Sequence, residues 1–265
     1  MKKVLSIAGS DSSGGAGIQA DIKTMLSNGV YAMSVITSLT AQNTLGVRAV
    51  QNADPVFLRQ QLDCVFEDIM PDAVKIGMVP GEEMVEVIAD RLRFYGASNI
   101  VVDPVMAASS GDSLMSRKSV NSLIREILPL ATLVTPNIPE AEVLSGIKIY
   151  GREDIIQAAQ RIYSDCGCSV LIKGGHKEHD SDDMLYHAGE FYSFESKRME
   201  NSNTHGTGCT LSSAIASNLA KGMTLPDSVK RAKKYISGAI AAGLDIGHGS
   251  GPLDHGYDIK TEYKN

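Results

Sequence analysis

The feature that most constrains this chain is a regular alternation between short apolar segments and longer amphipathic ones. The short segments are rich in Val, Ile and Leu, which favours buried strands, whereas the longer ones repeat apolar residues at helical spacing. Ile18, Ile22 and Met25, for example, share one face of a helix. Strands that alternate with helices form βαβ units, and their right-handed crossovers place helices on both faces of a mainly parallel sheet. The sequence therefore predicts an α/β fold of three layers.

The expected elements follow from these patterns. We expect strands over residues 4–8, 30–37, 73–76, 100–102, 133–135 and 170–172, and a hairpin over residues 184–187 and 191–194. We expect helices from residues 16 and 55, and over residues 84–94, 114–128, 155–166, 208–220 and 226–244. No linker, repeat or charge block divides the chain, so residues 1–265 are expected to form a single domain, with the charged stretch 177–183 as a surface loop.

Composition excludes several classes of protein. The formal net charge of −6 argues against a general binder of nucleic acid, which would carry a basic face. No run of about 18 apolar residues is present to cross a membrane. The apolar run near the N-terminus ends early in a glycine- and serine-rich loop, unlike a signal peptide. We therefore expect a cytoplasmic protein that binds neither nucleic acid nor membrane.

Polar and glycine-rich segments follow most of the expected strands. In an open parallel sheet, ligands bind beyond the carboxyl ends of the strands, and that is where these segments fall. They comprise residues 9–15, 40–43, 77–78, 103–106, 137–140 and 173–175. The sequence thus predicts one ligand site at this edge of the sheet.

The segment from Thr204 to Thr210, THGTGCT, precedes an apolar helix. Its glycines permit close approach of a ligand to the backbone, and a helix start offers unpaired N–H groups and partial positive charge. Together these features favour an anion hole for a transferring phosphoryl group. Cys209 lies in the first turn, where the helix lowers the pKa of a thiol. The alternative is an ordinary glycine-rich helix entry.

Asn137 and Glu140 are three residues apart after an expected strand, and Asp103 ends the neighbouring strand. An amide and two carboxylates are suited to hold hydrated Mg²⁺ beside nucleotide phosphates. The alternative is a capping box at a helix start for Asn137 and Glu140, and an N-cap or a loop salt bridge for Asp103.

Two further segments point to a planar substrate. Residues 11–17, DSSGGAG, match neither the GxGxxG nor the Walker A pattern, so their glycines predict a backbone surface for a flat ligand, or else a tight turn. Gln42 carries an amide that can accept from an exocyclic amine while donating to the adjacent ring nitrogen, as in adenine recognition. An aminopyrimidine shows the same edge. The alternative is a solvated loop amide.

These motifs together resemble a known family. AGSDSSGGAGIQAD, TAQNT, KIGM, DPVM, TPNIPEA, KGGH, THGTGCT and GHGSGP occur in this order across essentially the whole chain. The set closely resembles bacterial hydroxymethylpyrimidine/phosphomethylpyrimidine kinases, which are ribokinase-like enzymes of thiamine biosynthesis. The resemblance implies ATP and Mg²⁺ as cofactors, an aminopyrimidine as substrate, two successive phosphorylations, and a homodimer.

The resemblance also implies roles for individual residues. Gln42 would bind the aminopyrimidine, and Ala16, Asp21, Met78 and Val105 would line its pocket. Gly206, Thr207, Gly208 and Cys209 would form the anion hole. Asp103, Asn137 and Glu140 would organise Mg²⁺ and the phosphates, with Lys173, Lys233 and Asn137 near ATP.

One departure from the wider ribokinase pattern concerns the general base. Sugar kinases of that class carry an aspartate after the glycines, where this chain has Cys209. This residue is typical of the vitamin-kinase branch, and it leaves two possibilities open, a thiolate base or catalysis by positioning and electrostatics alone. We expect Cys209 to be the reactive cysteine, and Cys64, Cys166 and Cys168 to be small buried residues.

Two alternative functions remain open at this point. A pyridoxal or pyridoxine kinase would use the same scaffold, but Gln42 favours the aminopyrimidine because pyridoxal has no amine beside a ring nitrogen. A non-catalytic binding protein with a kinase fold would be expected to have lost Asn137, Glu140, Lys173 or the glycine-rich segment, all of which are present.

Overall fold

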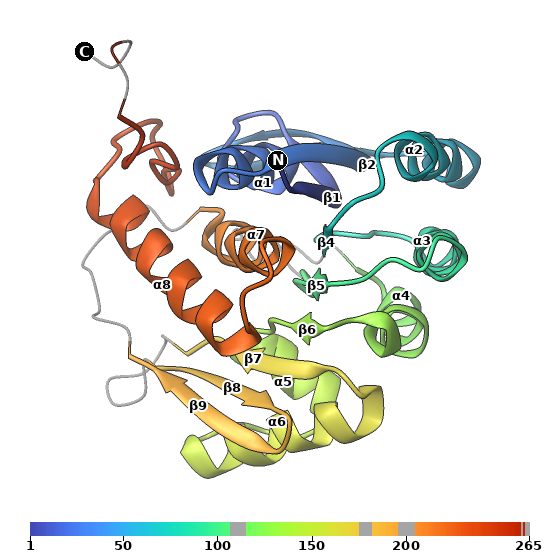
Figure 1. Ribbon diagram of the computed structural model, residues 1–265, viewed down its shortest axis with the longest axis vertical. Coiled ribbons are helices and arrows are strands. Elements are labelled where there is room, and N and C mark those ends of the chain that lie inside the picture. The colour runs from blue at the N-terminus through green and yellow to red at the C-terminus, as the bar shows by residue number, and fades with distance from the viewer. Residues whose placement is uncertain (107–114, 175–181, 196–204, 261, 263–265) are drawn as a thin grey trace.

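The computed structural model describes residues 1–106, 115–174, 182–195, 205–260 and 262. The centre of the molecule is one sheet with the strand order β3-β2-β1-β4-β5-β6-β7-β8-β9. Its strands are β1 Lys3–Asp11, β2 Tyr31–Asn43, β3 Gly46–Asn52, β4 Ala73–Ile76, β5 Ile100–Val102, β6 Leu133–Val134, β7 Ser169–Ile172, β8 Asp183–His187 and β9 Glu190–Phe194. Figure 1 shows this sheet between two layers of helices, which confirms the predicted three-layer α/β fold.

The strands β2, β1, β4, β5, β6 and β7 run parallel, and antiparallel strands close both edges. The hairpin β8–β9 was expected. The strand β3 was not expected, and β2 continues to Asn43 instead of ending at residue 37. Most side chains of β3 are exposed, so its sequence lacks the alternation of apolar and polar residues that marks a half-buried strand.

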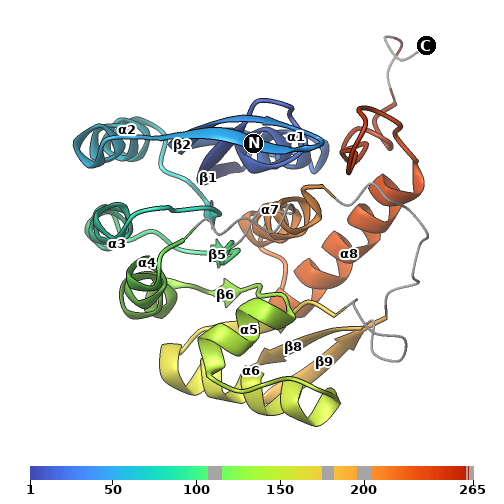
Figure 2. The same ribbon diagram turned by 180° about the vertical axis from the view of Figure 1, so that it is seen from behind.

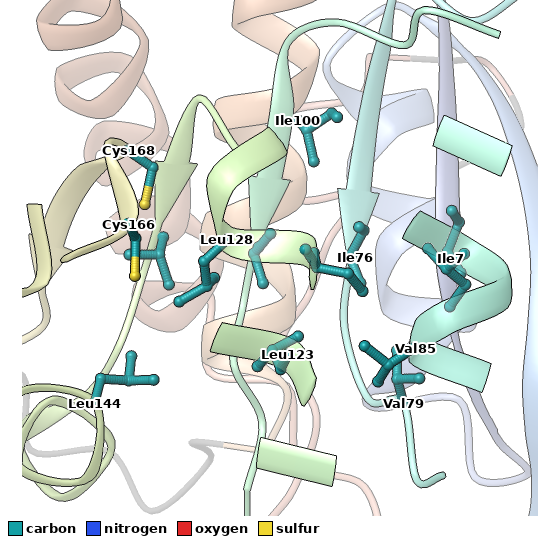
Figure 3. Close-up of a cluster of buried hydrophobic side chains, with 14 of the residues drawn as sticks. Ile7, Ile76, Val79, Val85, Ile100, Leu123, Leu128, Leu144, Cys166 and Cys168 are labelled. Carbon is teal, nitrogen blue, oxygen red and sulfur yellow. The ribbon is translucent and has the colours of Figure 1, made fainter. Parts of the chain in front are cut away.

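One face of the sheet is covered by the helices α2 Pro55–Asp68, α3 Glu82–Phe94, α4 Arg117–Ser122, α5 Ile138–Ser145 and α6 Arg152–Cys166. Alternate strand residues such as Ile7, Ile76 and Ile100 pack against them in one continuous core (Figure 3). The expected helix over 114–128 is interrupted. After α4 the chain widens into a π-helical turn, Leu123–Ile127, and then tightens into a 3₁₀ turn, Leu128–Leu130. Pro129 in that turn has no N–H group with which to continue an α-helix.

The opposite face carries α1 Gly17–Ser27, α7 Thr207–Ala220 and α8 Leu225–Ala241. Figure 2 shows α7 directly on the sheet and α8 outside it. The residues of α7 from Thr210 to Ala220 are all buried, because sheet, α1 and α8 surround this helix. Leu253 and His255, in the C-terminal segment, are buried against the same layer. The start of α7 is therefore held firmly relative to the strand ends.

In the part of the chain that the structure describes, no helix is both long enough and apolar enough to cross a membrane.

Candidate active site

The start of α7 faces the carboxyl ends of the central strands. Gly206 caps the helix with a φ of 81°, in the left-handed region, and a Cβ there would overlap the carbonyl oxygen of Gly15. A Cβ on Gly208 would lie 3.0 Å from Oδ2 of Asp103 and 3.4 Å from Nζ of Lys173. The glycines thus let the helix start approach the loop after β1 and the ends of β5 and β7. Gly206 has a positive φ, whereas Gly208 does not.

Three charged groups cluster beside this helix start. Nζ of Lys173 lies 2.8 Å from Oδ1 of Asp103 and 3.9 Å from Oε2 of Glu140. Burial raises the pKa of the Glu140 carboxyl, although the Lys173 ammonium opposes that effect. Burial would lower the pKa of Lys173, but Asp103 and Glu140 raise it above its usual value. The strand ends thus provide one firmly charged ammonium between two carboxylates.

Asn137 has a capping role. Its side-chain oxygen accepts from the N–H of Glu140 at 2.8 Å, and Oε2 of Glu140 accepts from the N–H of Asn137 at 2.8 Å. This is the capping box that the sequence left open as an alternative. The capping box uses one lone pair of the Asn137 oxygen and one carboxylate oxygen of Glu140, so the expectation that Asp103, Asn137 and Glu140 organise a metal ion stays a prediction.

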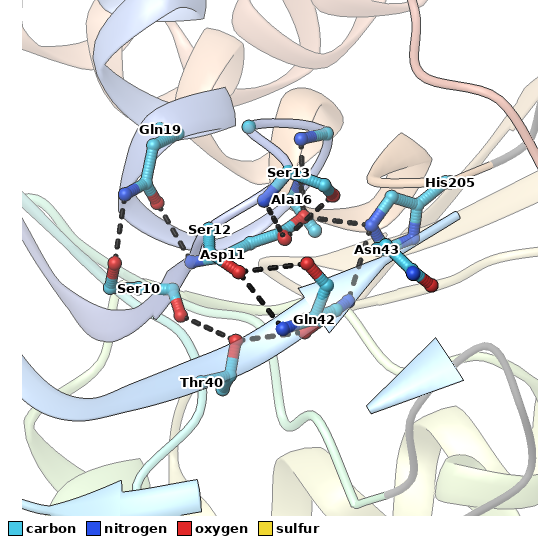
Figure 4. Close-up of polar contacts among 12 residues, drawn as sticks. Ser10, Asp11, Ser12, Ser13, Ala16, Gln19, Thr40, Gln42, Asn43 and His205 are labelled. Atoms are coloured by element: carbon cyan, nitrogen blue, oxygen red, sulfur yellow. Dashed lines mark hydrogen bonds and ion pairs between the residues drawn. The ribbon is translucent and has the colours of Figure 1, made fainter. Parts of the chain in front are cut away.

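Gln42 lies in a hydrogen-bonded network at the end of β2 (Figure 4). Its side-chain amide is 3.3 Å from Nε2 of His205 and 3.1 Å from Oγ1 of Thr40. His205 immediately precedes Gly206. It therefore connects the Gln42 amide, which is predicted to bind the substrate, to the predicted anion hole. The sequence suggested no role for His205, because its partners lie far away along the chain.

Asp11 organises the loop after β1. Its carboxylate accepts from the backbone N–H groups of Ser13, Gly15 and Ala16, from the Ser13 hydroxyl, and from Nε2 of His205 at 2.8 Å. Burial raises the pKa of this carboxyl, but the bond from His205 and those from the loop outweigh burial and hold it well below its ordinary value. Asp11 was a second residue for which the sequence suggested no role.

Asp21 does not line a pocket as expected, because its side chain is fully buried. It accepts from Nζ of Lys75, from the Ser6 hydroxyl at 2.6 Å and from the Ser213 hydroxyl at 2.8 Å. Burial would lower the pKa of Lys75, but the Asp21 carboxylate raises it, so Lys75 stays charged. The pair ties β1, β4, α1 and α7 together beneath the site.

Cys209 differs from the sequence prediction. Desolvation raises the pKa of its thiol to about 11, and the positive charge of Lys75 only partly opposes this effect. The residue is partly exposed, yet the surrounding protein outweighs the favourable helix start. The expectation of a thiolate is therefore wrong. Cys166 and Cys168 are buried as expected, whereas Cys64 is exposed.

The other expected pocket residues lie around the same strand ends. The N–H of Ala16 donates to Asp11, and Met78 follows β4 with its methyl group above Gly9. Val105 follows β5, and its N–H donates to the carbonyl of Asp103 at 2.8 Å. Met78, Val105 and Ala16 are each partly exposed, as lining residues must be.

Lys233 lies on α8 beside a cavity of about 720 Å³. Its Nζ is 2.6 Å from Oδ2 of Asp183, whose Oδ1 accepts from the N–H of Gly174. The walls of the cavity come from β9, the residue that follows it and α8, and include Tyr192, Phe194, Lys230, Lys233 and Lys234. Asp183 thus connects this cavity to the strand end that carries Lys173.

The residues present suit a magnesium nucleotide better than a metal held by protein alone. Over the described ranges of the chain, no three His, Cys, Asp or Glu side chains gather as a metal site. Asp103 and Glu140 supply two hard oxygen ligands, and Mg²⁺ typically binds through one or two carboxylates, waters and substrate phosphates.

The chain is similar to known proteins over most of its length. The chain is 49% identical over 253 residues to the thiamine biosynthesis bifunctional protein ThiED of Geobacter sulfurreducens, covering 95% of the chain and 52% of that protein, or about half its length. It is 49% identical to the hydroxymethylpyrimidine/phosphomethylpyrimidine kinase of Rhizobium meliloti, covering 95% and 96% of the two chains. The pyridoxal kinase of Bacillus subtilis, solved as an ADP complex, superimposes with a TM-score of 0.90 at 36% identity, covering 97% and 98%.

These similarities agree with the expected ribokinase-like fold. The phosphomethylpyrimidine kinase family model matches residues 11–254, which include the loop of Asp11, Gln42, the Asp103–Lys173–Glu140 cluster and the start of α7. The chain therefore belongs to the phosphomethylpyrimidine kinase family.

Proposed function

We propose that this protein transfers a phosphoryl group from ATP to the hydroxymethyl group of 4-amino-5-hydroxymethyl-2-methylpyrimidine, and then to the resulting monophosphate. The observation that carries the proposal is the adjacency of Gln42 and the α7 start. The amide of Gln42 contacts His205, and Gly206, which follows His205 in the chain, caps the start of α7. An aminopyrimidine bound by Gln42 would have its hydroxymethyl group within reach of the helix N–H groups.

The phosphoryl donor is proposed to bind along the other strand ends. ATP supplies the phosphoryl group when it is bound. Lys173 offers positive charge to the phosphates, and the cavity between β9 and α8, with Lys233 at its edge, offers space for the rest of the nucleotide. Mg²⁺ would be held by Asp103 and Glu140, and Asn137 would support this site by orienting Glu140.

Rate acceleration is proposed to come mainly from electrostatics. The helix start from Thr207 to Cys209 lies beside Asp103 and Lys173 at the strand ends, and its first N–H groups are proposed to stabilise the charge that develops on the transferred group. Cys209 is a neutral thiol at ordinary pH, because its pKa is raised to about 11. We therefore assign it to packing against substrate and not to proton abstraction, in keeping with a loose transition state that needs little base assistance.

A substrate panel tests the proposal. Purified protein with Mg-ATP is given the aminopyrimidine, its monophosphate or pyridoxal, and ADP release is followed. We expect turnover of both pyrimidines. Turnover of pyridoxal with neither pyrimidine would overturn the assignment, and no turnover of any acceptor would favour a non-catalytic binding protein.

A second candidate function is phosphorylation of pyridoxal. It is favoured by the high structural similarity to Bacillus subtilis pyridoxal kinase across nearly the whole of both chains. Gln42 argues for the pyrimidine as the better substrate, since pyridoxal presents no amine beside its ring nitrogen. A side activity on pyridoxal, with lower kcat/KM, is compatible with the main proposal.

We also propose that the protein is a cytoplasmic homodimer. The support is an exposed apolar edge, where Leu39 on β2, Leu45 in the following turn and Val50 on β3 are all about half exposed or more. Val50 shares its face of the β2–β3 ribbon with Thr40, whereas Leu39 points to the other face, so the proposed interface would cover this edge of the sheet from both sides. Light scattering of the purified protein should give twice the chain mass, and Val50→Lys on this edge should give the monomer.

A further inference from the structure

The proton on His205 can be placed from its partner. The Asp11 carboxylate only accepts hydrogen bonds, and five donors surround it. Nε2 of His205 is one of them, at 2.8 Å from Oδ2. Nε2 must therefore carry a hydrogen, and a ring nitrogen that carries a hydrogen has no lone pair left to accept a second bond.

This placement decides which end of the Gln42 amide faces His205. The amide nitrogen 3.3 Å away therefore cannot donate to Nε2, whereas the amide oxygen in that place can share the N–H with Asp11 in a bifurcated bond. At the other end, Oγ1 of Thr40 donates its one hydrogen to the carbonyl of Ser10 at 2.8 Å. The amide atom 3.1 Å from that hydroxyl has to be a donor, which means the nitrogen.

Both ends thus require the same orientation, opposite to the one drawn in Figure 4. The drawn orientation would place two donors face to face at His205 and leave the amide oxygen facing a hydroxyl whose hydrogen is used elsewhere. A half-turn of the amide exchanges two atoms of nearly equal size and moves nothing else. We infer that Asp11, through His205, and Thr40 act as positioning residues that fix the Gln42 amide with its oxygen toward His205 and its nitrogen toward Thr40.

A fixed amide has a consequence for specificity, which rests on the proposed function. The second lone pair of the oxygen and the second hydrogen of the nitrogen are left for the substrate. They match the 4-amino group and ring nitrogen N3 of the aminopyrimidine. The 4-oxo analogue in its lactam form presents an acceptor and a donor at these two positions. Both of these groups mismatch the amide. The analogue cannot rotate by half a turn in the site to correct the mismatch, because its hydroxymethyl group must face the start of α7.

The orientation can be measured without substrate. In protein labelled with ¹⁵N, the side-chain amide signal of Gln42 is assigned by its loss in Gln42→Leu. We expect its hydrogens to show nuclear Overhauser contacts to the methyl group of Thr40, and Nε2 of His205 to show the shift of a protonated nitrogen. Contacts of the amide hydrogens to the His205 ring, with Nε2 unprotonated, would overturn the inference.

The specificity is measured as the ratio of kcat/KM for 4-amino- over 4-oxo-5-hydroxymethyl-2-methylpyrimidine. A mismatched pair of hydrogen bonds should give the wild type a ratio of about tenfold or more. Thr40→Val and His205→Phe each free one end of the amide and should lower that ratio severalfold with KM for ATP unchanged. Thr40→Ser and His205→Gln keep a hydroxyl and an N–H donor, respectively, and should restore the ratio.

Ser12→Ala is the matched control, because within the described part of the chain the Ser12 hydroxyl bonds the backbone of Gln42 and not its side-chain amide. It should keep the wild-type ratio. An unchanged ratio in folded Thr40→Val and His205→Phe that still use the amino compound would refute the positioning role. If the wild type phosphorylates neither pyrimidine, the proposed function fails instead, and the nuclear Overhauser contacts still decide the amide orientation.

Discussion

At the scale of single residues, the largest difference between sequence and structure concerns the protonation state of Cys209. Its position in the first turn of a helix suggested a thiolate, but burial dominates and raises the pKa of the thiol to about 11. Cys64, expected to be buried, is exposed on α2. Sequence shows where a cysteine lies in a helix, but it does not show how completely neighbouring elements remove water from the thiol.

Thiol alkylation provides the first test at this scale. We expect iodoacetamide to label Cys64 before Cys209, read by peptide mapping, because the exposed thiol is more accessible. The rate constant for labelling of Cys209 should still be rising with pH at pH 10, since only the thiolate reacts and the pKa of the thiol is about 11. A rate for Cys209 that levels off below pH 9 would show that the helix start prevails over burial.

Substitution of Gln42 is the second test. Gln42→Leu removes a bidentate contact and should cost about 1–3 kcal/mol in kcat/KM for the aminopyrimidine, with KM for ATP unchanged. Gln61→Leu is the control. Among the described residues the Gln61 amide bonds the backbone of Ile36 in the middle of β2, so this substitution should affect stability alone. Equal losses for ATP and pyrimidine in Gln42→Leu would mean that Gln42 supports the fold.

At the scale of elements, the start of α7 joins segments that are distant in sequence. Gly206 rests on Gly15 in the loop after β1, and Gly208 faces the ends of β5 and β7 through Asp103 and Lys173. The buried Lys75–Asp21 pair holds the same helix from below through Ser213. The helix is therefore fixed on several sides before any ligand arrives, which favours a preorganised anion hole.

The two glycines should consequently fail in different ways. Gly206→Ala places a side chain against the Gly15 carbonyl at a positive φ, so it should destabilise the fold by more than the roughly 1–2 kcal/mol of backbone strain alone. At Gly222, with a φ of 84°, an added Cβ would meet no described residue within 4 Å apart from its chain neighbours, so Gly222→Ala reports that strain by itself. Gly208→Ala has helical backbone and should fold, but it should lose most activity by crowding Asp103 and Lys173.

Denaturant unfolding and kcat measure the two effects separately. A Gly206→Ala protein as stable as Gly222→Ala would contradict the close packing of α7 on the first loop. A Gly208→Ala protein with wild-type kcat would contradict the assignment of the helix start to phosphoryl transfer.

At the scale of the whole molecule, local patterns predicted the order of strands and helices because each buried element carries its own periodicity. They did not predict β3, whose exposed face has no such pattern. The edge of the sheet at which the candidate site lies could be predicted, because ligands bind beyond the carboxyl ends of parallel strands. The pairing of Asp11 with His205 and of Lys75 with Asp21 did not, since hydrogen-bond partners distant in sequence leave no local signal. The capping box of Asn137 and Glu140 was one of the two alternatives that the sequence offered, and the structure confirms it because both of its hydrogen bonds are local.

The C-terminal segment gives the whole fold a dependence on pH. His255 is buried with Nε2 3.0 Å from Oγ1 of Thr210, and burial together with Lys23 lowers its pKa from 6.5 to about 4. Below pH 6.5 the unfolded chain takes up a proton that the native state refuses, so stability is full above pH 6.5 and falls as the pH drops to 4. The loss amounts to about 3 kcal/mol.

The free energy of unfolding, measured with urea from pH 7 to pH 4, should therefore fall less steeply with pH in His255→Gln than in the wild type. The exposed His248 provides the control, and His248→Gln should keep the wild-type slope. Identical slopes in all three proteins would rule out His255 as the source of this sensitivity to acid.

The central claim, that this site selects an aminopyrimidine, is tested most directly by internal competition. Equimolar 4-amino-5-hydroxymethyl-2-methylpyrimidine and pyridoxal are mixed with Mg-ATP and protein in one vessel, and the two phosphorylated products are quantified early in the reaction. Their ratio equals the ratio of kcat/KM values, whatever the fraction of active enzyme. The account predicts that the pyrimidine phosphate predominates in the wild type and loses that advantage in Gln42→Leu. Predominance of pyridoxal phosphate in the wild type would contradict it.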